Sequence, residues 1–240
     1  MAAKTVTFES VLHSVWRRSG GDPGDDISNL SVTQAATVTD FINTSYEAAW
    51  KFYEWPDVVV VEARTAVAQL IAWNQAGKTE VETWFNVCVN DPRLSASPRR
   101  IPFSVAPDGI YLSTTYAAAE VYVVYRPHPP VFTSTEFAAA AAYAAGDKIF
   151  YPTTGECYTA NATTIAGEDP VDTPAKWDKL DCLKMLAEAV KNGAYALLLQ
   201  SEGQHTTAQL PDSAMLDVLT READRIQLQS GQYRTISISR

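Results

Sequence analysis

YAAGDKIFYPTTGECYTANATTIAGEDPVDTPAKWDKL, residues 143–180, is the stretch that decides how this 240-residue chain is organised. Glycines and prolines stand in turn-like settings between spaced aromatic residues, and a tryptophan comes near its end. We therefore expect a small three-stranded β module over 137–180, able to fold as a separable unit. So short a sheet has little core, and Tyr151, Tyr158 and Trp177 would supply most of its buried area.

Segments with helical periodicity flank this module on both sides. Apolar residues recur at helical spacing in four segments, which are 5–18, 31–54, 181–202 and 211–229. Ser31 and Gln34 have the spacing of a capping box, which marks the start of the second helix. Because neither terminal pair of helices buries much surface alone, we expect 1–56 and 181–229 to form one helical bundle domain.

The stretch 57–132 has a different character, rich in β-branched and aromatic residues. We expect five or six strands there, as a β-sheet excursion from the bundle. The glycine in NQAGK (74–78) indicates a hairpin turn between 69–73 and 79–89, and Pro-Asp-Gly at 107–109 indicates another turn. The predicted fold class is α+β, a helical bundle with this excursion and the small three-stranded module, followed by an extended polar tail over 230–240.

Charge and hydropathy limit the partners of the chain. The net charge is −9 and the pI is about 4.8, so tight binding of duplex DNA through a basic face is disfavoured. An acidic surface still suits a channel through which DNA slides without sticking. The N-terminus lacks the pattern of a secretion signal, and no apolar run reaches the ~18 residues that span a bilayer. We expect a protein made in the cytoplasm that makes no membrane contact.

The sequence contains no recognisable catalytic constellation. Its three histidines and three cysteines (His13, His128, His205, Cys88, Cys157 and Cys182) do not have metal-ligand spacing. Nucleophile-elbow, phosphate-loop and dinucleotide motifs are absent, and GGDPGDD (20–26) lacks EF-hand spacing. We therefore expect no catalytic, cofactor-binding or metal-binding residue and no enzymatic activity. The three cysteines are expected to be buried or half-buried thiols.

The module resembles the small chitin-binding carbohydrate-binding modules. The resemblance rests on Gly146-Asp147 between Tyr143 and Tyr151, on Gly155 with Tyr158, and on the turn that ends at Trp177. It implies a three-stranded fold in which Tyr151, Tyr158 and Trp177 are core residues or carbohydrate contacts. In that family a flat sugar platform uses aromatics after the second strand, whereas residues 160–165 here read ANATTI. We therefore favour a structural or interaction module over an active sugar binder.

The whole chain resembles the head–tail adaptor (neck or connector) proteins of tailed bacteriophages. The resemblance rests on the order of segments and on four short patterns, which are Asp91-Pro92-Arg93, Asp108-Gly109-Ile110, Tyr125-Arg126-Pro127 and Pro129-Pro130. It implies a ring, commonly of twelve copies, that binds the portal protein and tail or neck proteins in the virion. DNA would pass through this ring without sequence-specific contact.

Two other classes of function stay open. One is a carbohydrate-binding accessory or tail-side protein that contacts the host envelope, and the other is a cytoplasmic structural protein unrelated to phage. Five aromatic residues serve either as subunit faces or simply as core: Trp50, Tyr53, Trp55, Trp73 and Trp84.

Overall fold

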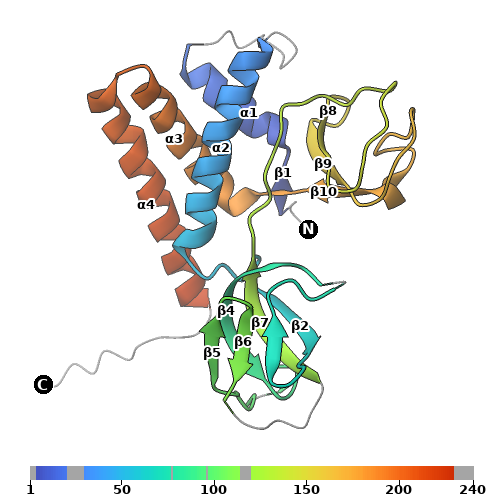
Figure 1. Cartoon of the computed structure of the whole chain (residues 1–240). Helices are drawn as coiled ribbons and strands as arrows, with labels where there is room; N and C mark the ends of the chain where they lie inside the picture. Colours follow the sequence, from blue (N-terminus) through green and yellow to red (C-terminus); the bar gives the residue numbers. More distant parts are fainter. Residues whose placement is uncertain (1–3, 21–29, 77, 96, 114–119, 230–240) are drawn as a thin grey trace, which may run out of the picture. The chain divides into compact units, whose positions relative to one another are not determined.

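A computed structural model describes residues 4–20, 30–76, 78–95, 97–113 and 120–229, and it mixes helix with several small sheets (Figure 1). The chain folds into two compact units. One unit joins Met1–Tyr53 to Pro130–Arg240, and the other is Glu54–Pro129. The predicted tail over 230–240 and most of the predicted loop at 20–26 lie outside the described residues.

The part of the first unit that the structure describes contains four α-helices, α1 (Phe8–Arg18), α2 (Val32–Phe52), α3 (Lys184–Ser201) and α4 (His205–Gln229). Helix α3 packs against the other three (Figure 1). The predicted capping box at the start of α2 is confirmed. The Gln34 amide donates to Ser31 Oγ at 3.2 Å, and the Ser31 amide donates to Gln34 Oε1 at 3.1 Å.

Gly193 lets three of these helices come close together. A Cβ atom built on Gly193 in α3 would lie 2.5 Å from Met215 Sδ of α4 and 2.9 Å from Ser45 Oγ of α2. Any larger residue would therefore force the Met215 and Ser45 side chains to shift. Around this point the helices bury alanine, valine and leucine side chains, including Leu186 and Val190 of α3.

The link between α3 and α4 corrects the predicted start of the last helix. Gly203 has φ +79 and forms a Schellman motif: its amide donates to Gln200 O at 3.0 Å, and the Gln204 amide donates to Leu199 O at 2.8 Å. Helix α4 then begins at His205 rather than at 211. Pro211 lies inside the helix, so its usual preference for the first turn gave the wrong boundary.

The beginnings of the first and third predicted helices are also wrong. Residues 5–6 form a strand, β1 (Thr5–Val6), which pairs with β11 (Cys182–Leu183) in antiparallel register. Helix α1 therefore begins at Phe8, where the Thr7 hydroxyl accepts a hydrogen bond from the Ser10 amide. Pairing between segments so distant in sequence leaves no local signal.

The described residues of the second unit form six strands in two three-stranded antiparallel sheets. They are β2 (Val60–Thr65), β3 (Leu70–Ala72), β4 (Val81–Cys88), β5 (Phe103–Ala106), β6 (Gly109–Leu112) and β7 (Glu120–Pro127). The strand orders are β2-β7-β4 and β3-β6-β5. Side chains from both sheets, such as Val123 and Ile110, share one hydrophobic core.

Both predicted turns are present, since the Lys78 amide donates to Gln75 O at 3.0 Å, but only the Pro107-Asp108 turn joins two paired strands. Strands β5 and β6 form a hairpin through Pro107-Asp108, with Ala106 opposite Gly109. A Cβ on Gly109 would lie 2.1 Å from Ile71 O, so only glycine fits beside β3. NQAGK does not form a hairpin: β3 pairs with β6, while β4 pairs with β7.

The small sheet follows in the first unit. It consists of β8 (Lys148–Tyr151), β9 (Glu156–Ala160) and β10 (Trp177–Leu180), in the order β10-β9-β8, with a short 3-10 turn, η2 (Pro174–Lys176), before β10. Both pairings are antiparallel. The outer edge of β8 is covered by residues 135–137, since the Phe150 amide donates to Thr135 O at 2.7 Å and the Phe137 amide donates to Phe150 O at 2.8 Å.

Candidate functional site

The three residues expected as core or carbohydrate contacts gather in one aromatic cluster of the small sheet. Trp177 is only 4% exposed and packs with Ile149 and Ala160. Its ring meets that of Tyr143 at 5.4 Å, edge to face, and its indole N–H donates to Glu168 O at 3.2 Å. A tryptophan that is buried and bonded in this way supports the sheet and offers no flat face to a sugar.

Tyr151 and Tyr158 lie half-buried against this cluster. Their rings are 6.4 Å apart in an edge arrangement. The Tyr151 hydroxyl donates to Asp169 Oδ2 at 3.1 Å, and the Tyr158 hydroxyl lies 3.3 Å from Thr154 Oγ1. The polar end of each tyrosine is thus used within the module.

Phe137 completes the cluster and was missed at the sequence level. Its ring stacks on Tyr143 at 5.7 Å and meets Tyr151 edge to face at 5.6 Å. It stands before the glycine-containing motif in an alanine-rich segment, so only its aromatic character could have pointed to it.

The segment after the second strand of the module presents no aromatic side chain. Ala160 and Thr164 are buried, and Ile165 is the large apolar residue that is exposed there, at 66%. The Thr164 hydroxyl accepts from the Tyr143 amide at 3.0 Å, while the Thr164 amide donates to Tyr143 O at 2.9 Å. The segment is therefore fixed to the aromatic cluster and lacks the stacking surface that carbohydrate sites use.

The module is bonded to the start of α1. The Glu9 amide donates to Gly155 O at 3.0 Å. Phe8 stacks on Phe132 at 5.2 Å and meets Phe150 at 6.0 Å. Gly155 has φ +67, and a Cβ there would lie 2.2 Å from a Glu9 carboxylate oxygen. The turn at Gly155 and the start of α1 can therefore come this close only because residue 155 is a glycine.

A buried carboxylate lies at the same junction. Glu156 is 6% exposed, and its Oε1 lies 2.9 Å from Lys179 Nζ. Burial raises the pKa of Glu156, while Lys179 and the Phe8 amide oppose that rise. Its Oε2 is buried and has no hydrogen-bond partner among the described residues. Ion pairing at this site therefore offsets the cost of desolvation only in part.

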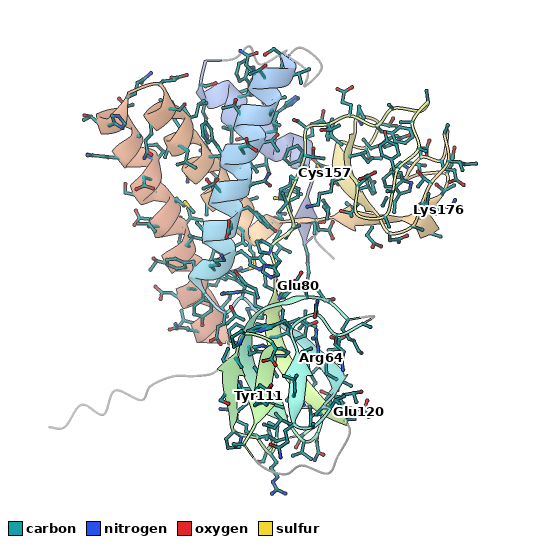
Figure 2. The ribbon with its side chains drawn as sticks, viewed as in Figure 1. Arg64, Glu80, Tyr111, Glu120, Cys157 and Lys176 are labelled. Carbon is teal, nitrogen blue, oxygen red and sulfur yellow. The ribbon has the colours of Figure 1, made fainter. Side chains whose placement is uncertain are left out.

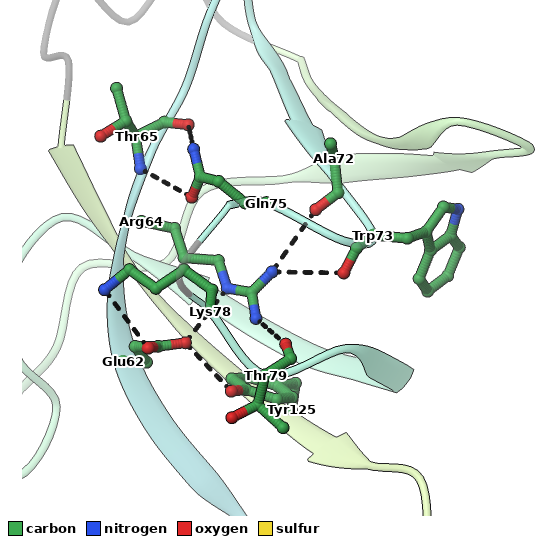
Figure 3. A network of polar contacts seen from close by, with 9 residues as sticks. All are labelled: Glu62, Arg64, Thr65, Ala72, Trp73, Gln75, Lys78, Thr79 and Tyr125. Carbon is green, nitrogen blue, oxygen red and sulfur yellow. Dashed lines mark hydrogen bonds and ion pairs between the residues drawn. The ribbon is translucent and has the colours of Figure 1, made fainter. Parts of the chain in front are cut away.

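The second unit, Glu54–Pro129, which we call the β-unit, contains another buried charge, Arg64 of β2 (Figure 3). Its side chain is fully buried. Nε donates to Glu62 Oε2 at 3.3 Å, and Nη1 lies 3.4 Å from both the Ala72 and Trp73 carbonyl oxygens. Nη2 donates to Thr79 O.

The surroundings of Arg64 are aromatic and acidic. The guanidinium lies 4.8 Å from the Tyr125 ring centroid and 5.4 Å from that of Trp84. Glu62 also accepts from the Tyr125 hydroxyl at 3.0 Å and pairs with Lys78 at 3.2 Å. Arg64 therefore binds backbone carbonyls at both ends of the 72–79 connection.

Each unit also has a surface depression. One of about 670 Å³ runs beside α1 and is lined by Thr7, Glu9, Ser10, His13, Ser14, Arg17, Arg18 and Lys191. Another, of about 590 Å³, is lined by Trp73, Asn74, Glu80, Val81, Glu82, Pro107, Asp108 and His128. Arg18 and Glu82 are already paired, with Glu188 and Arg126 respectively, both at 2.8 Å.

The cysteines are buried thiols. Burial raises the pKa of Cys157 and Cys182 to about 12, and it also raises the pKa of Cys88. Cys157 lies where β9 meets α1, and its Sγ donates to Thr133 O at 3.2 Å (Figure 2). Within the described ranges, no three His, Cys, Asp or Glu side chains are grouped so that they could hold a metal ion.

Three of the five aromatics that could have served subunit faces are core residues. Trp50, Trp55 and Trp84 are buried, whereas Trp73 and Tyr53 are half-buried. The Trp73 ring lies 5.5 Å from that of Trp84, and its indole N–H donates to Ala106 O at 3.0 Å.

Comparison with known proteins adds no family. No protein-family model matches the chain, and no curated protein is significantly similar to it in sequence. Among the helices described, none is both long and apolar enough to cross a membrane.

Proposed function

We propose that this protein is a structural virion protein, a head–tail adaptor of a tailed bacteriophage. Copies of the chain, commonly twelve in such adaptors, form a ring between the portal protein and the tail or neck proteins. The ring lines the DNA channel and contacts the passing DNA without sequence specificity. The protein is made in the host cytoplasm and ends in the virion at the head–tail junction, without membrane contact.

The observation that supports this proposal best is the order of the segments. Helices from both ends of the chain belong to one unit, and the β-unit enters and leaves that unit between Tyr53 and Pro130. The small sheet then interrupts the same unit before α3. This is the segment order on which the resemblance to adaptor proteins rests.

The proposed mechanism is geometric and involves no catalytic step. The helices act as one bundle that docks on the portal, and the β-unit meets neighbouring subunits or the next ring. The tail over 230–240 becomes ordered when it docks, by adding backbone hydrogen bonds to a neighbour. The net charge of −9 favours a lumen from which DNA phosphates are repelled.

The alternative, a carbohydrate-binding accessory or tail-side protein contacting the host envelope, is less well supported. Its best support is the three-stranded sheet with clustered aromatics. Against it, Trp177 is buried and residues 160–165 carry no aromatic side chain. We propose that the module is an interaction or structural element on the outside of the ring.

The decisive experiment is a reconstruction of purified virions by electron microscopy, with mass spectrometry of the same particles. We expect the chain as a ring under the portal. Removing residues 230–240 should leave the protein folded and give tailless or leaking heads. Normal infectious particles from the truncated protein would exclude the role of the tail, and absence of the chain from virions would overturn the whole proposal.

A further inference from the structure

The outer strand β5 of the second unit has an unusual composition for an exposed edge. Its residues Phe103–Ala106 pair only with β6 among the described strands, and β5 lies on the outside of the sheet in Figure 1. Ser104 and Val105 are exposed, Val105 at 64%. None of the four residues is charged.

At two positions of β5, the backbone groups have no partner strand among the described residues. In the hairpin, Ala106 is opposite Gly109, and the Ser113 amide donates to Pro102 O at 2.9 Å. Antiparallel pairs alternate between bonded and non-bonded positions, so these two bonded pairs place Phe103 and Val105 at the non-bonded ones. The N–H and C=O groups of Phe103 and Val105 therefore point away from β6, toward the outer edge.

The other outer strands of four or more residues, within the described ranges, are protected. Charged residues lie within β2, β4 and β10, for example Glu62, Glu82 and Lys179. Residues 135–137 cover the outer edge of β8. Proteins usually guard an exposed edge with charges, prolines or a covering segment, because a bare edge is a template for another strand. Strand β5 has prolines only at its ends, Pro102 and Pro107, so its middle is open for pairing.

The chain itself contains a segment suited to this edge. Residues 230–240 read SGQYRTISISR, in which Thr, Ile, Ser, Ile and Ser alternate with the period of a β-strand. The segment has no acidic residue, and Arg234 and Arg240 flank the alternating run. At the Pro107 end of β5 lies the depression lined by Glu80, Glu82 and Asp108, so an arginine meets opposite charge there whichever way the segment runs.

We propose that residues 235–239 of one copy add as a fourth strand to β5 of a neighbouring copy. Ile236 and Ile238 then lie on the same face as Val105, and the backbone groups of Phe103 and Val105 receive partners. This inference rests on the proposed ring, because it assigns the segment to another copy, and it names the surface that each subunit offers to the next.

Disulfide trapping in the full-length protein tests the register. Directly opposite residues on neighbouring strands have their α-carbons about 4.5–5.5 Å apart, which is within the reach of a disulfide. Val105→Cys protein is mixed with a second protein carrying Ile236→Cys, Ser237→Cys or Ile238→Cys, and the mixture is mildly oxidised. The native thiols give little background because they are buried and their pKa values are raised.

The expected result is a covalent dimer with cysteine at 236 or 238, in at least tenfold excess over the dimer formed with cysteine at 237. Val67→Cys is the matched control, because Val67 is similarly exposed (69%) in the same unit but lies outside the strands, and it should trap none of the three. Equal trapping at 236, 237 and 238, or no dimer at all, would overturn the proposal.

Three further outcomes are distinguished when a Val105→Cys/Ile236→Cys double variant and purified virions are added to these tests. A dimer formed by Val105→Cys alone would assign the edge to β5 of another copy, and thus overturn the assignment to the tail. A disulfide formed within one chain of the Val105→Cys/Ile236→Cys double variant, with no dimer in the mixture, would overturn the assignment to a neighbour. Absence of the protein from virions would overturn the proposed function while leaving the trapped register intact, so the two failures are distinguishable.

Discussion

Replacing Arg64 with methionine should destabilise the β-unit by about 4 kcal/mol. Methionine fills much of the volume of arginine but cannot donate a hydrogen bond, so the carbonyl groups of Ala72, Trp73 and Thr79 lose their shared donor. Glu62 keeps Lys78 and the Tyr125 hydroxyl as partners, and the Trp73 carbonyl keeps the Val81 amide at 3.4 Å, so the cost comes mainly from the carbonyls of Ala72 and Thr79. Each buried carbonyl that loses its donor costs about 1–3 kcal/mol, so the two together cost about 4 kcal/mol.

Hydrogen exchange followed by mass spectrometry is the suitable assay, because it reports the opening of residues 54–129 separately from the rest of the chain. Peptides from 60–88 and 120–127 should lose protection by a factor of about 10³, which corresponds to about 4 kcal/mol at 1.4 kcal/mol per tenfold change. Arg93→Met is the matched control. Arg93 is 61% exposed and pairs with Asp91 at the surface, so this change should leave the protection of the same peptides nearly unchanged. Equal protection in the two variants would refute the assignment of Arg64 as the organiser of the 72–79 connection.

Four other outcomes can be checked directly. Leu186→Asp, at a fully buried position of α3, should unfold the helices by placing an unpaired charge in the core, and a melting curve like that of the parent would show that this helix face is not core. Comparison of Glu156→Gln with the parent should reveal a pH-dependent difference in stability, because the pKa of Glu156 is raised in the folded protein. The parent should gain stability relative to the variant as the pH falls through that raised pKa toward the usual glutamate pKa. A series of urea titrations in which the parent instead loses stability over this pH range would contradict the prediction. The chain should not be retained on insoluble chitin, and retention that Tyr151→Ala abolishes would restore the sugar-binding alternative. Deleting 138–179 with a short linker should keep the helical circular-dichroism signal, and its loss would show that the module is part of the main core.

The sequence allowed helix starts and turns to be predicted where the residues that form them lie close together in the chain. Ser31 and Gln34 marked the start of α2 because a capping box is formed by residues three apart. Pro107-Asp108 with Gly109 marked the β5–β6 turn for the same reason, since the turn residues and the positive φ of Gly109 lie within four positions of one another.

The errors share a different physical cause. Residues 5–6 were assigned to a helix because their partner, 182–183, is remote in sequence. The 74–78 turn was assigned to a hairpin because the strands on either side of it pair with β6 and β7, which are remote in sequence. Pro211 was taken as a helix start, although the Schellman motif at Gly203 already allows α4 to begin at His205.

The aromatic cluster was predictable in membership but not in role. Tyr151, Tyr158 and Trp177 are equally compatible with a core and with a binding face in the printed sequence. Burial of Trp177 and its bond to Glu168 depend on how the 161–176 connection folds over the sheet. Phe137 could not be predicted as a member for a similar reason. It lies outside the glycine-containing motif in the sequence, and only the folding of the chain brings it against the cluster.

The pairing of β1 with β11 imposes an order on the biosynthesis of the chain. Thr5 lies opposite Leu183, so 178 residues separate the two partners. At a synthesis rate of about 5–20 residues per second, strand β1 waits about 10 to 35 s for its partner to be translated. During that time α1 has no α3 to cover Val11, Leu12 and Val15, which are fully buried in the finished protein. The nascent chain therefore exposes the apolar face of α1 until residues 184–201 have been translated, and we expect ribosome-associated chaperones to bind this helix in the meantime.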